Sequence, residues 1–232
     1  MWGIFWRLYA AHLFSLFPLL TNIASRSADT KKLVWSHTIV VAITTTLVVV
    51  YSAVYRPLLF ALVPLVAVYH YILDIVVLRI RPNSPRGVLL AALGWEFILA
   101  GLLILTSAAF AWGYVYPGTD AFFRLSLAVF ALWGAPHFIY LVKSTIAGKM
   151  PQLPFVERFK NFAFVERTLL YIGISASSIY IVAAGILIAV LIRLLIYLNE
   201  ENVPIPLWEW VLVVLLAGVP RAFMGGIKIF GL

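Results

Sequence analysis

The sequence contains no cysteine among its 232 residues. Disulfide bonds, thiolate metal sites, cysteine nucleophiles and cysteine-held iron–sulfur clusters are therefore excluded. Charged residues are also scarce, at 11%, where an average soluble domain has about 25%. No soluble core of this size could bury the 64% of residues that are hydrophobic. The composition predicts an all-α integral membrane protein, a polytopic helix bundle that forms a single domain over residues 1–232.

Long apolar segments follow one another with only short polar interruptions. A helix needs about 20 apolar residues to cross a bilayer. Seven segments qualify as transmembrane helices: residues 3–24, 33–55, 57–78, 88–114, 122–142, 165–198 and 207–229. Pro57 is suited to open the third helix, and Ser84-Pro85 to cap and open the fourth. The sixth segment is longer than a crossing needs, so we expect it to tilt or to bend near Gly173 or Gly185. A break into two spans would make eight crossings, and no turn signal stronger than a lone glycine favours it.

Lysine and arginine are distributed unequally between the two sides of this predicted bundle. One side has thirteen of the seventeen: Arg26, Lys31, Lys32, Arg79, Arg81, Arg86, Lys143, Lys149, Arg158, Lys160, Arg167, Arg221 and Lys228. The other side has four: Arg7, Arg56, Arg124 and Arg193. The richer side should be cytoplasmic. We therefore predict a multipass protein of the plasma membrane with its N-terminus outside and its C-terminus in the cytoplasm.

The basic residues lie at predicted helix ends, so membrane lipids are expected as partners and nucleic acid is not. Seven of them are expected to contact lipid headgroups: Lys31, Lys32, Arg81, Arg86, Lys149, Arg158 and Lys160. Within the cytoplasmic loop 143–164, Phe155, Phe159 and Phe162 recur at helical spacing with charged residues between them. This pattern is typical of a short helix lying in the membrane interface. Docking of that helix on the protein's own cytoplasmic face remains an alternative.

Six histidine and acidic side chains in the predicted spans are candidates for a functional site, because an acidic group there costs about 2.5–3.5 kcal/mol. They are His12, His37, His70, Asp74, Glu96 and His137. By depth, all but His12 are expected to share one layer of the membrane, open toward the cytoplasm. His70 and Asp74 lie one helical turn apart on one face.

Two interpretations of these side chains are open. The first is a metal or proton-handling site, since histidine and carboxylate ligands suit zinc, manganese or iron(II). Its candidate residues are His37, His70, Asp74 and Glu96. The second is ordinary helix packing, in which each histidine bonds a carbonyl or hydroxyl group and Asp74 pairs with Arg79 or His70.

No organic cofactor is expected. A haem held by two histidines requires them at equal depth on facing helices. His37 with His137, or His70 with His137, is such a pair, but the opposite leaflet has no second pair. A metal ion at the polar cluster is the only cofactor kept as an alternative.

Several short motifs resemble an uncharacterised prokaryotic family of multipass membrane proteins. Ala11-His12 is followed by Phe17, Lys31-Lys32 precedes His37, and the third helix carries His70-Tyr-Ile-Leu-Asp74. That family has His-x-x-x-Asp-Phe-x-x-Gln in its first helix, a histidine-rich second helix and His-x-x-x-Asp in its third. In this chain, Glu166-Arg167-Thr168-Leu169 is followed by an apolar helix that reaches Arg193, and this segment resembles the second half of the family.

The chain departs from the family pattern at three positions. Leu16 and Leu20 stand where the family has aspartate and glutamine, and Val41 replaces a second histidine of helix 2. Because half of the polar set is replaced by apolar residues, the pattern favours a non-catalytic accessory or structural subunit of a larger membrane complex, with other membrane proteins as partners. The alternatives are a small transporter or proton or ion conductor that uses the His/Asp cluster, and a membrane-embedded, metal-dependent hydrolase.

Overall fold

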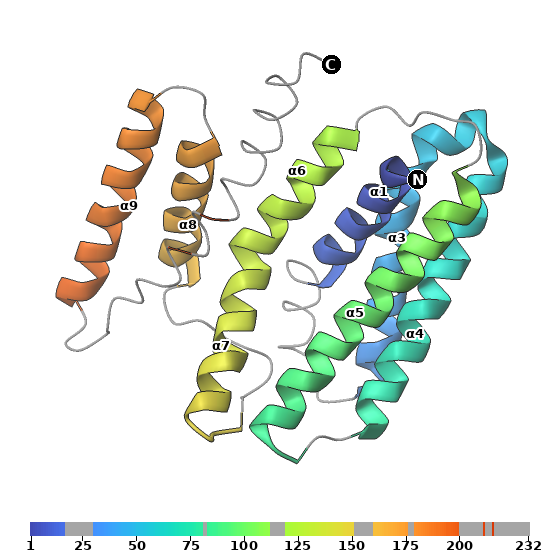
Figure 1. The fold of residues 1–232 in the computed structure, drawn as a ribbon, viewed down its shortest axis with the longest axis horizontal. Coiled ribbons are helices and arrows are strands. Elements are labelled where there is room, and N and C mark those ends of the chain that lie inside the picture. Colours follow the sequence, from blue (N-terminus) through green and yellow to red (C-terminus); the bar gives the residue numbers. More distant parts are fainter. Residues whose placement is uncertain are drawn as a thin grey trace. The chain divides into compact units, whose positions relative to one another are not determined.

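The computed structural model describes residues 1–16, 30–80, 83–111, 119–150, 160–175 and 179–199, together with Val211 and Leu215. Regular structure in these ranges is helical, which confirms the predicted all-α class (Figure 1). The chain divides into two compact units. We call them the N-terminal unit (Met1–Ser126 with Tyr140–Phe155) and the C-terminal unit (Leu127–Ile139 with Val156–Leu232).

Four helices build most of the N-terminal unit: α1 (Trp2–Phe14), α3 (Thr30–Tyr55), α4 (Leu62–Ile80) and α5 (Pro85–Phe110). Helix α1 contacts α3 and α5, and α4 contacts the same two helices. The four helices therefore enclose a common interior. Short connections make α4 antiparallel to both α3 and α5, so the start of α3, the end of α4 and the start of α5 lie at the same end of the unit.

Proline and serine set the helix boundaries as predicted. Arg56 leaves the helical conformation, and Pro57 opens the short 3₁₀-helix η2 (Pro57–Ala61) that leads into α4. Pro85 occupies the first turn of α5, where its missing N–H breaks no hydrogen bond. The Ser84 side chain accepts a hydrogen bond of 3.1 Å from the Gly87 backbone N–H and thereby caps the helix.

Between the middle of the helices and the end marked by Arg56, the interior of the N-terminal unit combines apolar side chains with the buried Arg7, Thr45, Ser52 and Ser107. Its fully buried side chains include Leu8, Leu62, Leu99 and Leu103. Each of these leucines lies on the Arg56 side of the ionisable residue that the site takes from the same helix. The buried leucines therefore pack the helices together on that side of the ionisable residues.

Replacing Leu99 by alanine is expected to lower the free energy of unfolding by about 2 kcal/mol, because the cavity left behind loses packing contacts. The lower end of the usual range applies, since lipid is as apolar as the protein interior. Replacing the exposed Phe97 of the same helix by alanine should change stability by less than about 0.5 kcal/mol. Unfolding in mixed SDS micelles, followed by circular dichroism, measures both. Equal effects would show that the buried leucines do not hold the unit together.

Three helical segments are long and apolar enough to cross a membrane: Lys31–Tyr55, Pro57–Ile80 and Pro85–Phe110. They correspond to the predicted spans 33–55, 57–78 and 88–114. The fifth predicted span, 122–142, comprises α6 (Thr119–Val129), the π-helical η3 (Phe130–Gly134) and α7 (Ala135–Ile146). Its two halves are bent by 41°, and they add a fourth crossing if they form one span. A π-helical turn followed by Pro136 accounts for the bend.

The prediction of one continuous helix over residues 165–198 is wrong. The segment forms α8 (Lys160–Ser175) and α9 (Ile179–Asn199), which pack extensively against each other (Figure 1). Two short helices can bury a face against one another, whereas a single helix of this length would exceed the bilayer. The predicted count of seven spans and the cytoplasmic C-terminus both depended on a single crossing here, and the break removes that support.

Other predictions lie partly outside the described residues. They concern the first span beyond residue 16, nearly all of the seventh span 207–229, the interfacial helix around Phe155 and Phe159, and the headgroup contacts of Arg81 and Arg158. Within the described ranges, the expected headgroup residues Lys31, Lys32, Arg86 and Lys149 have exposed side chains. Their contact with lipid stays a prediction.

Candidate functional site

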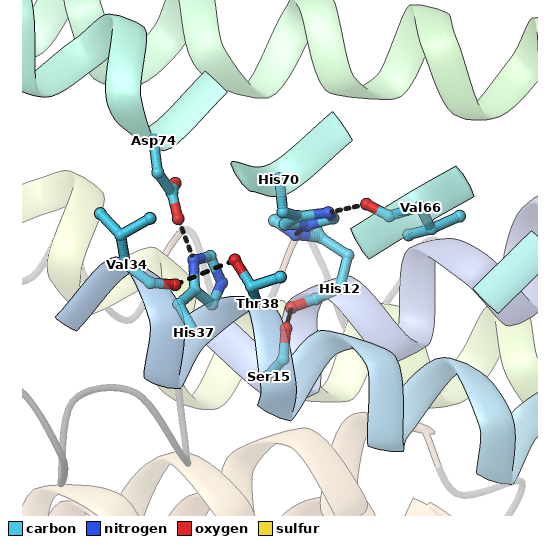
Figure 2. Close-up of polar contacts among 8 residues, drawn as sticks. All are labelled: His12, Ser15, Val34, His37, Thr38, Val66, His70 and Asp74. Atoms are coloured by element: carbon cyan, nitrogen blue, oxygen red, sulfur yellow. Dashed lines mark hydrogen bonds and ion pairs between the residues drawn. The ribbon is translucent and has the colours of Figure 1, made fainter. Parts of the chain in front are cut away.

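Five of the six ionisable residues flagged in the sequence gather inside the N-terminal unit. Helix α1 supplies His12, α3 supplies His37, α4 supplies His70 and Asp74, and α5 supplies Glu96. Figure 2 shows how four of them lie between α1, α3 and α4. The sixth residue, His137, belongs to the part of α7 that lies in the C-terminal unit.

The prediction that His12 would lie apart from the other histidines is wrong. A first span over residues 3–24 would place His12 near its middle, but α1 ends at Phe14 and His12 lies in its last turn. The Ser15 hydroxyl, which follows the helix, donates a hydrogen bond of 2.7 Å to the His12 carbonyl oxygen. Contacts with His70 and Glu96 place the His12 imidazole in the same layer as these two residues.

Three residues form a continuous hydrogen-bonded chain, which we call the relay (Glu96, His12 and His70). The His12 Nδ1 atom lies 3.0 Å from His70 Nε2, and His12 Nε2 lies 3.2 Å and 3.4 Å from the two carboxyl oxygens of Glu96. The His70 Nδ1 atom lies 2.9 Å from the Val66 carbonyl oxygen, one turn earlier in α4. All four ring nitrogens of the two histidines therefore have partners.

This pattern determines how many protons the relay holds. The Val66 carbonyl only accepts, so His70 Nδ1 carries a proton and donates it. One proton lies between His70 and His12, and one lies between His12 and Glu96, because neither contact can join two acceptors. A proton that starts on Glu96 can therefore reach His70 by two short transfers within existing hydrogen bonds.

A second pair, which we call the dyad (His37 and Asp74), lies beside the relay. The His37 Nδ1 atom lies 2.7 Å from Asp74 Oδ2. An ionised Asp74 accepts a hydrogen bond from His37 Nδ1–H and thereby leaves a lone pair on Nε2 when the ring is neutral. Among the described residues, this Nε2 atom is buried and has no hydrogen-bond partner. The His37 and His70 ring centroids are 5.3 Å apart and nearly perpendicular.

Burial differs sharply between the histidines and the carboxylates. The three histidines are at most 2% exposed, whereas the side chain of Asp74 is 16% exposed and that of Glu96 is 30% exposed. The accessible groups are therefore the two carboxylates, and the imidazoles connect them through the interior. Of the packing alternatives, the carbonyl bond of His70 is present, and Asp74 pairs with His37 and not with His70.

Trp95 is a member of the site that the sequence analysis missed. Its ring centroid lies 5.0 Å from that of His12, 5.6 Å from that of His70 and 6.3 Å from that of His37. The chain has eight tryptophans, and only the position next to Glu96 in the sequence distinguished this one.

The geometry does not favour the metal interpretation. His12 and His70 use both ring nitrogens in hydrogen bonds, so neither has a lone pair to offer a metal ion or a haem iron. Among the described residues, no group of three or more histidine and carboxylate side chains is placed to hold a metal ion. The metal site of His37, His70, Asp74 and Glu96 stays a hypothesis.

The C-terminal unit contains a buried ion pair between α8 and α9. The Arg193 Nε atom lies 2.9 Å from Glu166 Oε1, and Arg193 Nη2 lies 2.6 Å from Glu166 Oε2. Glu166 is fully buried and the Arg193 side chain is 10% exposed. Both residues belong to the motifs of the family resemblance, but their pairing depends on the break between the helices, so the sequence alone did not indicate it.

The chain was compared with protein-family models, with curated proteins and with solved structures. The resemblance to a multipass family stays a prediction, because none of these comparisons gives a match.

Proposed function

We propose that this protein is a membrane-embedded proton transporter or conductor whose proton-handling centre is the relay together with the dyad. The observation that carries the proposal is the head-to-tail chain from Glu96 through His12 to His70, with every ring nitrogen partnered. Such a chain moves a proton without moving a side chain, whereas ordinary packing needs only one bond per histidine. Ionisable groups among apolar membrane helices are typical of proton pathways.

Beyond the relay, the next acceptor is His37. Its Nε2 lone pair is buried beside the His70 ring, and Asp74 stabilises the imidazolium that forms when a proton arrives. Both ring nitrogens of His70 are hydrogen-bonded, one to His12 and one to the Val66 carbonyl oxygen. Proton transfer from His70 to His37 therefore requires a rotation of the His70 ring or a bridging water molecule. The transfer is therefore gated and not continuous.

The gated step between His70 and His37 fits a transporter better than an open channel. We therefore expect slow turnover that requires a conformational change.

We propose an orientation for the N-terminal unit from the charges at the ends of its candidate spans. Lys31 and Lys32 at the start of α3, Arg79 in the last turn of α4 and Arg86 in the first turn of α5 share one end, and Arg56 lies at the other. The basic end is proposed to face the cytoplasm, with the relay nearer that side. The number of further crossings, the side of the C-terminus and the plasma membrane as location stay predictions.

Proton flux into liposomes tests the proposal directly. Full-length protein reconstituted with an internal pH dye should acidify the lumen when a potassium diffusion potential is imposed, and protein-free liposomes should not. Replacing His70 by glutamine should slow this flux at least about tenfold, because an amide does not relay protons as an imidazole does. The matched control is His137→Gln, which changes a histidine outside the relay and should retain wild-type flux.

Two results would reject the proposal: no flux above that of empty liposomes, or an unchanged flux in the His70 variant. The accessory-subunit prediction is compatible with a relay that serves a larger complex. Its own test is the mass of the particle extracted from native membranes, which should exceed 25.9 kDa and include other polypeptides in fixed ratio.

A further inference from the structure

We infer that His12 carries the resting positive charge of the relay, held between the Glu96 carboxylate and the Trp95 ring, so that Trp95 is a positioning residue for protonation. The inference rests on the proposed function for its significance, but not for its geometry. It assigns a charge to one of the three histidines, which the hydrogen-bond pattern alone leaves open.

The hydrogen bonds of the relay allow three distributions of the same protons. In the first, Glu96 is protonated and both histidines are neutral. In the second, Glu96 is ionised and His12 is an imidazolium. In the third, the positive charge lies on His70. The choice depends on which site the surroundings stabilise.

The hydrogen-bond partners of the two histidines favour a positive charge on His12 over one on His70. His12 contacts both carboxyl oxygens of Glu96, at 3.2 Å and 3.4 Å, whereas the partners of His70 are a neutral carbonyl and an imidazole. A carboxylate within hydrogen-bond distance stabilises an imidazolium far more than a backbone carbonyl does.

Trp95 adds a second contribution on the same ring. An aromatic face attracts a cation within about 6 Å of its centroid. The His12 centroid lies 5.0 Å from that of Trp95, tilted by 45°, and it is the nearest of the three imidazoles. The Tyr9 ring packs against His12 from α1 itself, at 5.8 Å. The imidazolium would therefore have a carboxylate at one edge and aromatic rings beside it.

Glu96 and His12 differ in burial. The Glu96 side chain is 30% exposed, while His12 is fully buried. A buried imidazolium needs its counter-ion at contact distance, and Glu96 is placed to supply it. The charge would then be stored one transfer away from His70.

Nitrogen NMR of the full-length protein labelled with ¹⁵N-histidine tests the assignment, because the chain has only four histidines. At pH 7 the wild type should show one more imidazolium signal than His12→Gln. The same signal should be lost in Glu96→Gln, which removes the counter-ion and keeps the shape of the side chain. If neither variant loses an imidazolium signal, the assignment to His12 is wrong.

Trp95 is tested by two replacements in the same spectra. Trp95→Phe should keep most of the His12 imidazolium signal, and Trp95→Leu should shift the protonation equilibrium toward the neutral ring by about tenfold. Loss of the signal in the leucine variant with recovery in the phenylalanine variant supports the positioning role. Full retention in the leucine variant would make Trp95 a packing residue only and overturn this part of the inference.

Fluorescence provides an independent measurement where a variant disturbs the fold. A neighbouring imidazolium quenches indole emission. The emission of Trp95 is the difference between a protein that has Trp95 and the same protein with Trp95→Phe. This emission should be at least about twofold brighter in Glu96→Gln than in the wild type. Equal brightness would contradict the inference. If the two variants lose an imidazolium signal but the wild-type protein shows no proton flux, the proposed function is rejected and the charge assignment still holds.

Discussion

Replacing Asp74 by asparagine is expected to reduce proton flux by about a hundredfold or more and to leave the helical fold intact. The carboxylate lies 2.7 Å from His37 Nδ1 and holds the proton there, which keeps the Nε2 lone pair available. An asparagine amide can donate to Nδ1 and thereby stabilise the opposite tautomer, in which Nε2 carries the proton. The same replacement next to a catalytic histidine lowers rates by about 10⁴ in the serine proteases.

The flux assay with a potassium diffusion potential measures this effect, and circular dichroism reports the fold. Thr38→Val is the matched control, because the Thr38 hydroxyl donates only to the Val34 carbonyl oxygen of its own helix, 2.9 Å away, and lies next to His37 in the sequence. Its flux should remain within about twofold of the wild type. If the asparagine variant conducts as well as the wild type, the dyad does not belong to the proton pathway.

Replacing Arg193 by methionine is expected to lower the free energy of unfolding by about 3–5 kcal/mol, because it removes the positive charge that faces the fully buried Glu166 carboxylate. Methionine retains much of the length and apolar volume of the arginine, so the loss reports the charge and not a cavity. Unfolding in mixed SDS micelles, followed by circular dichroism, measures the effect.

The double variant Glu166→Gln with Arg193→Met serves as the control for this prediction. It removes both charges, so most of the stability lost in the single variant should return. A single variant that loses less than about 1 kcal/mol would mean that the ion pair does not hold α8 and α9 together. A double variant as unstable as the single one would show that the loss comes from packing.

The predicted helix boundaries were closest where proline and serine mark them. Pro57 and Pro85 open their helices because the ring fixes a helical backbone and lacks an N–H that the first turn would not use. The segment 165–198 was wrong because an apolar run gives the same signal for one long helix and for two short ones. The serines at positions 175, 177 and 178 interrupt it, but their tendency to bond their own backbone is weak within an apolar run.

The sequence identified the members of the site better than their partners. Glu96 and Asp74 were recognisable because a carboxyl group in a membrane helix needs a stabilising neighbour. Which neighbour each one has depends on the rotation and depth of separate helices, and the contact of His12 with His70 and Glu96 was not foreseen for that reason. Trp95 has no chemical signal of its own in the sequence, since its role comes from three imidazoles on other helices.

The ion pair between α8 and α9 also has a consequence for biosynthesis. Glu166 and Arg193 lie 27 residues apart in the chain, so α8 cannot bury its carboxylate against this guanidinium until α9 has been synthesised. We therefore expect α8 to gain its final packing only after α9 has formed, so that the two helices fold together as one hairpin.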